Sequence, residues 1–397
     1  MYFFNEHTKY LLKNCTKSGW RSAYKKISGE ENSVGREKII DISHELKSEK
    51  LFPESHVLRW AIENISEEIN YLNDNYDYAI CVAIDIIEKT ICNETKSYSE
   101  INIFITAYID IYKKNNTKNR IFERNCSRFT RDYSQTLYLT IECINELKNI
   151  LVDQLDFSLG SIKEHVANGS YPALFSSATG GILVHEAIGH MLELGVNSKF
   201  EKMLGDQIAP KFLSVIDDPT LDGKYGTCIV DDYGDTAKKV KLIDNGVLSS
   251  FLTDRNTSKK LNLENNGHGR REGYMTDPTP RMTNTYIVGC EKKQSVVNDY
   301  PKRIVISKID WGRVKPKTGN FLLKVSEAYV NTGDKKTHLL PFCIRGDVTN
   351  LLRNIECIGK EVVFQNSYCH AKSGVIPVSY GQPDIYISNI ECIPIIE

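Results

Sequence analysis

Residues 176–190 read Ser-Ser-Ala-Thr-Gly-Gly-Ile-Leu-Val-His-Glu-Ala-Ile-Gly-His, and they divide the chain into two differently patterned halves. Polar and glycine residues precede an apolar run here, which is typical of a helix start. We therefore expect a helix to begin near Gly180, with Ser177 or Thr179 as its N-cap. The order of residue types predicts a helix at the junction of two domains.

The same stretch contains a His-Glu-x-x-x-His pattern formed by His185, Glu186 and His190. On a regular α-helix, a spacing of five residues places the two rings about 140° apart. Both histidines can bind one metal ion only if the helix is widened, as in a π-bulge, or broken near Gly189. The alternative is a pair of histidines that pack on a helix beside a solvated Glu186. A catalytic zinc site also needs a third protein ligand, which the spacing does not identify.

The half of the chain before this stretch predicts a mixed α/β N-terminal domain over residues 1–165. Helical spacing of apolar residues alternates with β-like runs, and two such runs are too few to fix a topology. The expected helices cover residues 36–50, 53–72 and 134–155, and the expected strands cover residues 78–91 and 101–112.

The half after it predicts a β-rich C-terminal domain of antiparallel sheet, over residues 166–397 with the helix included. Asn245-Gly246 lies between two apolar runs, which is the strongest short-range signal for a hairpin. Further strand-like runs extend to residue 390, and the boundary between the domains is expected between residues 156 and 176. The fold class is therefore predicted to be α+β.

Composition limits the classes of partner. The chain has 397 residues, enough for two or three domains of roughly 150 residues. Fifty Lys and Arg oppose 51 Asp and Glu, so no overall basic field favours nucleic acid. No apolar run approaches the roughly 20 residues that span a membrane, and the N-terminal residues do not resemble a secretory signal. The 11 cysteines include no Cys-x-x-Cys pair, so we expect a cytoplasmic protein with mostly buried thiols.

Several segments, taken in order, resemble the TldD/PmbA family of metalloproteases, and in particular its metal-bearing TldD branch. The resemblance covers residues 170–390 strongly and residues 79–155 weakly. The matching segments are Leu183–His190, Val230–Gly234, Leu242–Leu248, Thr253–Arg255, Gly269–Glu272, Pro280–Tyr286, Cys369, Ile376–Val378 and Gly381–Pro383.

This resemblance implies a metal site made of His185, His190 and Cys369, with Glu186 as the general base. It implies one divalent metal ion, with zinc favoured and iron as the alternative, because a thiolate ligand disfavours magnesium and calcium. His370 is a rival to Cys369. Neighbouring residues of a strand point to opposite faces, so we expect only one of the two to reach the ion.

The glycine-rich loop that holds His268, Arg270 and Arg271 is a candidate for substrate binding. The arginines could hold a peptide carboxylate or stabilise an oxyanion, and the alternative is a turn with solvated arginines. Asp231 and Asp232 could orient a motif histidine, although turn residues are the simpler interpretation.

The resemblance therefore implies a cytoplasmic metallopeptidase acting on unfolded or partly degraded peptides, with leader removal from a modified peptide as a narrower version. It implies a related second subunit or a homodimer, and an N-terminal domain shorter than is usual in the family. Two alternatives stay open. One is a binding or scaffold subunit with a structural metal ion, and the other is a metal-dependent oxygenase that uses the two histidines and Glu186.

Overall fold

The computed structural model describes residues 2–15, 35–41, 65, 76–92, 97–114, 116–160, 163–179, 181–273, 276–290, 303–332 and 335–395. The chain divides into two compact units, Met1–Gly160 and Ser161–Glu397. Each unit has its own sheets and its own hydrophobic core. No helix among the described residues is long and apolar enough to cross a membrane.

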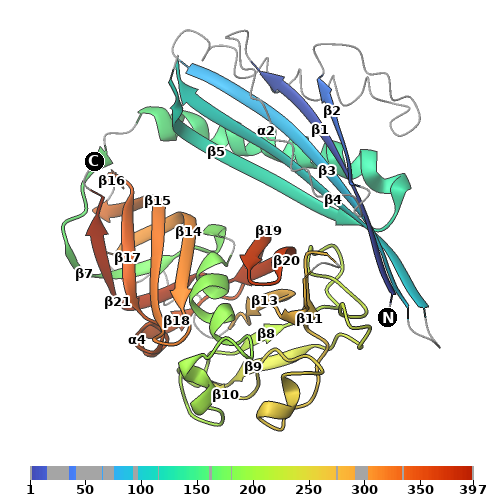
Figure 1. The fold of residues 1–397 in the computed structure, drawn as a ribbon. Helices are drawn as coiled ribbons and strands as arrows, with labels where there is room; N and C mark the ends of the chain where they lie inside the picture. The colour runs from blue at the N-terminus through green and yellow to red at the C-terminus, as the bar shows by residue number, and fades with distance from the viewer. Residues whose placement is uncertain are drawn as a thin grey trace. The chain divides into compact units, whose positions relative to one another are not determined.

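The first unit is a five-stranded sheet in the order β2-β1-β3-β4-β5, with the long helix α2 beside it (Figure 1). All neighbouring strands are antiparallel except β1 and β2. The elements are β1 Tyr2–Cys15, β2 Gly35–Asp41, β3 Tyr76–Cys92, β4 Ser97–Lys113, β5 Asn116–Thr130, the short 3₁₀ helix η2 Tyr133–Gln135 and α2 Thr136–Gly160.

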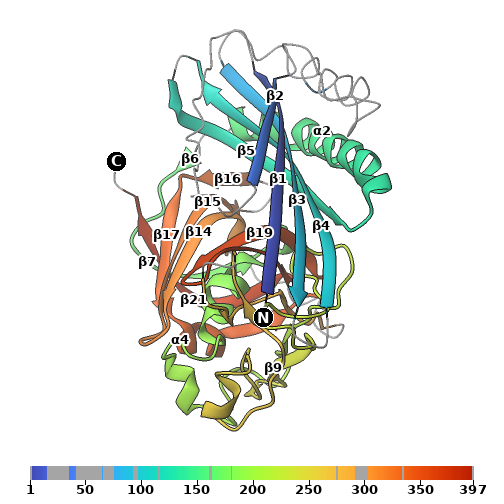
Figure 2. The same ribbon diagram turned by 45° about the vertical axis from the view of Figure 1, so that its right-hand side comes forward.

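Helix α2 covers one face of this sheet (Figure 2). Ile80, Val82 and Ile84 alternate along β3 and are fully buried on the same side. Cys143 and Leu147 of α2 belong to the same cluster. Burial of alternate residues against one helix explains why only one face of β3 is strongly apolar.

The sequence-based expectations for this unit have mixed outcomes. The strands expected at 78–91 and 101–112 and the helix expected at 134–155 are confirmed by β3, β4 and α2. The helix expected at 36–50 is wrong where it is described, because residues up to Asp41 form β2 and pair with β1. The helix expected at 53–72 lies outside the described residues except for Ile65, which is helical.

The second unit contains a six-stranded sheet in the order β10-β9-β8-β13-β20-β19. Within the described part of the chain β19 is at its edge, where it pairs with β20. The strands are β8 Val215–Asp217, β9 Val240–Asp244, β10 Val247–Leu248, β13 Asn284–Ile287, β19 Val363–Ala371 and β20 Gly374–Gln382.

A second sheet of this unit curves until it closes. Its order is β14-β7-β21-β17-β15-β16-β6, and β14 also pairs with β15, so five strands complete a ring (Figure 1). The strands are β6 Lys163–Glu164, β7 Gly169–Phe175, β14 Ile304–Lys315, β15 Asn320–Thr332, β16 Lys335–Leu339, β17 Phe342–Asp347, β18 Ile355–Ile358 and β21 Ile385–Pro394.

Short elements connect the sheets of the second unit. They are the two-stranded pair β11 Gly269–Arg270 and β12 Thr279–Pro280, the helices η3 Ser177–Thr179, η4 Val184–Ile188, η5 Gly189–Met191, η6 Lys199–Lys202 and η7 Ser258–Lys260, and α4 Val348–Arg353. Leu183, Val184 and Ile188 are buried in the same core cluster as residues of both large sheets. The motif helix is therefore held inside the unit.

The predicted excess of β-structure is confirmed, and several sheets with few helices are consistent with an α+β fold. The Asn245-Gly246 hairpin is also confirmed, because both residues have positive φ between β9 and β10. The expectation of antiparallel sheet holds for most strand pairs of this unit but not for all of them. The pairs β13–β20, β14–β7 and β16–β6 are parallel, and each joins segments that are far apart in the sequence. Such long connections leave no local pattern.

Candidate metal centre

The helix that carries the motif is wider than a regular α-helix. His185 N–H donates to the Gly181 carbonyl at 3.0 Å, as in an α-helix. Residues Val184–Ile188 then form the π-helix η4, and Gly189 N–H faces the carbonyls of both Val184 and His185. The 3₁₀ turn η5 follows at once. The widening that a shared metal site requires from a five-residue spacing is therefore present.

The two imidazole rings face one another as a result. The ring centroids of His185 and His190 are 4.8 Å apart and the rings meet edge to face. Neither expected N-cap, Ser177 or Thr179, caps this helix, because both residues belong to the separate turn η3, where the Thr179 hydroxyl donates to the Ser176 carbonyl. Helical residues begin at Ile182, close to the expected start.

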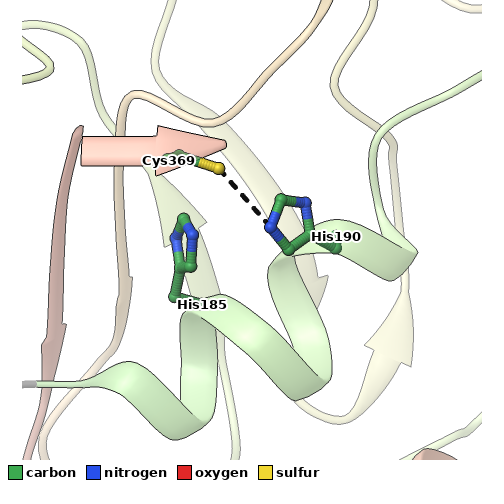
Figure 3. A group of neighbouring side chains, drawn as sticks. All are labelled: His185, His190 and Cys369. Atoms are coloured by element: carbon green, nitrogen blue, oxygen red, sulfur yellow. Dashed lines mark hydrogen bonds between the residues drawn. The ribbon is translucent and has the colours of Figure 1, made fainter. Parts of the chain in front are cut away.

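Cys369 reaches the histidines from strand β19 (Figure 3). Its Sγ lies 3.4 Å from His190 Nε2, and one ligand atom from each of the three residues lies within 4.8 Å of the others. Cys369 is buried, whereas the next residue, His370, is exposed. Alternation along the strand thus turns Cys369 toward the histidines and His370 away from them.

The ring of His190 is held by a carboxylate on its other side. His190 Nδ1 lies 3.0 Å from Glu193 Oε2, which leaves Nε2 facing Cys369. A histidine that binds a metal ion usually has such a partner on its second nitrogen. Glu193 was not predicted, although its position three residues after His190 is a spacing that makes neighbours on a helix.

The thiol and the imidazoles of this cluster change one another's pKa values. Burial raises the pKa of the Cys369 thiol, but His185 and His190 outweigh this effect and lower the pKa to about 3. Burial lowers the pKa of His190, whereas Glu193 and Cys369 raise it well above its usual value. His185 Nδ1 is buried without a hydrogen-bond partner. Two imidazole nitrogens and one thiolate form a donor set that fits zinc or iron and leaves a coordination position open.

Glu186 lies beside these three residues and is not one of the clustered ligands. Its side chain packs against Gly312 of β14, where a Cβ atom would lie 2.7 Å from Glu186 Cγ. Burial raises the pKa of Glu186, and the nearby histidines oppose that increase. A carboxyl group with a raised pKa next to a candidate metal site is a suitable proton acceptor.

Tyr380 of β20 is a neighbour that the sequence did not indicate. Its ring centroid lies 4.8 Å from that of His185. Burial raises the pKa of Tyr380 to about 12, so its hydroxyl is neutral near pH 7. The only sequence signal is its position next to the Gly381–Pro383 segment.

The glycine-rich loop is tied to the interior. His268 is fully buried, with Nε2 3.0 Å from Asp217 Oδ1. Arg270 is also buried and donates to the carbonyls of Met282 and Pro377. Arg271 is half-buried and donates to the Thr276 carbonyl at 3.1 Å. These contacts are structural, and substrate binding by His268, Arg270 and Arg271 stays a prediction.

Asp231 and Asp232 hold the same loop rather than a motif histidine. Asp231 Oδ2 accepts the Gly269 N–H at 3.0 Å, and Asp232 Oδ2 accepts the Arg271 N–H at 2.6 Å. The position next to the motif histidine is taken instead by Glu193. The interpretation of the two aspartates as turn residues agrees with these contacts.

Comparisons with known proteins identify the family to which this region belongs. Residues 168–393 match the PmbA/TldA metallopeptidase C-terminal domain. The chain is 31% identical over 231 residues to the metalloprotease TldD homolog of Buchnera aphidicola subsp. Acyrthosiphon pisum, covering 56% of this chain and 48% of the relative. It is 30% identical over 229 residues to the zinc metalloprotease TldD homolog of Saccharolobus solfataricus, covering 56% and 51%. The chain thus spans about half the length of these curated relatives.

Solved structures share the fold at low sequence identity. TldE from Thermococcus kodakarensis superposes with a TM-score of 0.60 at 16% identity, covering 84% of this chain and 72% of that one. A putative modulator of DNA gyrase from Bacteroides thetaiotaomicron gives 0.62 at 14% identity, covering 89% and 74%. Because the matched C-terminal domain accounts for more than half of the residues, the chain belongs to the TldD/PmbA family of metallopeptidases.

Proposed function

We propose that the protein is a metal-dependent peptidase that hydrolyses unfolded or partly degraded peptides. The observation that carries this proposal is the cluster of His185, His190 and Cys369, in which His185 and Cys369 are buried, with Glu186 beside it and outside the cluster. Relatives named metalloproteases support it. In this proposal His185, His190 and Cys369 hold one metal ion, with zinc favoured by the donor set and iron as the alternative.

The bound ion would supply two kinds of chemistry, polarisation of the scissile carbonyl and a lowered pKa of the attacking water. Glu186 accepts a proton from that water and transfers it to the leaving amine. Its raised pKa suits both steps, because a proton acceptor works best when its pKa is close to the working pH. Glu193 holds the His190 ring at Nδ1, so that Nε2 stays directed toward Cys369.

Substrate selection in this proposal depends on the peptide backbone. Strand β19 carries Cys369 and, among the described strands, has β20 as its partner. An extended peptide can add to the edge of a sheet through main-chain hydrogen bonds, which bind with little sequence selectivity. This mode suits unfolded peptides and also the leader segment of a modified peptide. Arg271 is half-buried and is the least buried member of the predicted substrate-binding set, since His268 and Arg270 are buried.

We infer that the working assembly contains a second subunit. The likeness to TldE from Thermococcus kodakarensis supports a family-related partner, and a homodimer is the other form to test. A cytoplasmic location is part of the same proposal, since the nine cysteines whose side chains the structure describes form no disulfide with one another.

Metal removal tests the peptidase proposal. The chain should lose cleavage of an unstructured peptide mixture after chelation and regain it when zinc or iron(II) is added, and mass spectrometry of the products measures this. The metal that restores more cleavage is the cofactor. A scaffold subunit would bind the metal in a closed four-ligand site and cleave nothing, and X-ray absorption at the metal edge counts the ligands.

A further inference from the structure

Arg281 is the largest fully buried side chain of the described residues, and it joins the two halves of the metal centre. A buried guanidinium group is costly unless its donors find partners. Nη1 donates to Ser373 Oγ at 2.8 Å and to the Gly374 carbonyl at 3.2 Å. Nη2 donates to the Cys369 carbonyl at 2.9 Å. One end of Arg281 therefore holds the strand that presents the thiol.

The other side of Arg281 faces Glu193. Arg281 Nε lies 3.6 Å from Glu193 Oε1, which makes an ion pair but not a hydrogen bond, and both side chains are almost completely buried. The second carboxylate oxygen of Glu193 lies 3.0 Å from His190 Nδ1. Glu193 Oε1 also accepts the backbone N–H of Met282, the residue after Arg281. The carboxylate is thus fixed between Arg281 and the ring of His190.

We propose that Arg281 and Glu193 are positioning residues that fix the metal-binding geometry of His190 and Cys369. Glu193 orients the His190 ring, and Arg281 both compensates the charge of Glu193 and sets the position of the Cys369 backbone. The inference rests on the proposed metal site, but it concerns the arrangement of the ligands and not the hydrolytic step.

Arg281 links two segments that are far apart in the sequence. Its guanidinium group contacts Cys369, which lies 88 positions later in the chain, and Glu193 of the motif segment. Asp217 provides a matched control for Glu193, because it is also a buried carboxylate next to a histidine. Its Oδ1 lies 3.0 Å from Nε2 of His268, which is not one of the proposed metal ligands.

The test is a titration of the metal-free full chain with Co²⁺, followed by the visible absorption of the cobalt–thiolate site. Loss of the hydrogen-bond partner of a metal-binding histidine typically weakens metal binding about 10–100-fold. We expect Glu193→Gln and Arg281→Met each to weaken Co²⁺ binding by about that factor and to shift the cobalt bands. Arg281→Lys keeps the charge and should bind Co²⁺ more tightly than Arg281→Met. Asp217→Asn should leave the bands and the affinity unchanged, because Asp217 faces His268 and not a proposed ligand.

Arg281→Met leaves Glu193 buried without its cation, so this variant can fail to fold. The double variant that combines Arg281→Met with Glu193→Gln removes both buried charges. It can therefore be titrated if the single variant Arg281→Met does not fold. A folded Glu193→Gln or double variant that binds Co²⁺ within twofold of the wild type, with an unchanged spectrum, would overturn the proposal. Equal losses in Asp217→Asn would also overturn it. The titration measures metal binding and not peptide cleavage. A negative peptidase assay would therefore contradict the proposed function without changing the outcome of the titration.

Discussion

Gly312 of β14 offers a direct way to displace Glu186 without touching a metal ligand. A Cβ atom at this position would lie 2.7 Å from Glu186 Cγ, 2.9 Å from Glu186 Cβ and 2.6 Å from Leu323 Cδ2. Carbon atoms pack at about 3.5–4.0 Å, so Gly312→Ala forces these neighbours to move by roughly 1 Å. The change therefore acts on the position of the proposed base.

The size of the effect follows from that displacement. Misplacing a catalytic group by about 1 Å can reduce turnover about 100-fold, which corresponds to about 2.7 kcal/mol in the barrier. Overpacking of a core costs about 1–3 kcal/mol of stability. Without the contact, alanine in a strand would be favoured over glycine by about 0.5–1 kcal/mol. A net loss of stability in Gly312→Ala would therefore show that the added methyl group is too close to its neighbours.

The assay compares peptide turnover, bound metal and urea unfolding in Gly312→Ala and in Gly273→Ala. Gly273 has nothing within 4 Å of the added Cβ atom, so it controls for the substitution itself. We expect Gly312→Ala to keep its metal ion and to lose between 10- and about 100-fold in turnover, while Gly273→Ala is unaffected in both. Folded, metal-loaded Gly312→Ala with turnover within twofold of the wild type would refute the placement of Glu186 as the base.

Two further predictions concern the ligands and the interior. Cys369→Ala should lose bound metal while His370→Ala retains it, measured by elemental analysis, and the reverse result would contradict the choice of ligand. Burial raises the pKa of Asp217, but His268, Thr283 and Thr285 outweigh it and lower that pKa below its unfolded value. Asp217 therefore contributes stability that is complete above about pH 5 and lost as the pH falls below about 4. Asp217→Asn should flatten this acid dependence in urea unfolding, and an unchanged slope would contradict the assignment.

The sequence predicted the features that depend on residues close together in the chain. The five-residue spacing of His185 and His190 required a widened helix, and η4 provides one. Asn245-Gly246 predicted the hairpin between β9 and β10 because only residues that tolerate positive φ fit such a turn. The presence of Cys369 beside the histidines came from family resemblance, since 179 residues separate it from His190.

Contacts across the fold could not be predicted in this way. His268 was placed in a candidate substrate-binding loop, but its partner Asp217 lies 51 residues earlier, and the pair is fully buried. No sequence pattern linked Arg281 to the metal site, and only the folded chain shows that it contacts both Glu193 and the Cys369 carbonyl. Parallel strand pairs were missed for the same reason, because long connections separate their members.

The most direct test of the proposed mechanism measures bound metal and peptide cleavage on the same samples of wild type and Glu186→Ala. The account predicts about one metal ion per chain in both proteins, because Glu186 is outside the ligand cluster. Turnover should fall by a factor on the order of 10²–10⁴, the usual contribution of a general base. Metal-loaded Glu186→Ala that cleaves peptides as fast as the wild type would contradict the account.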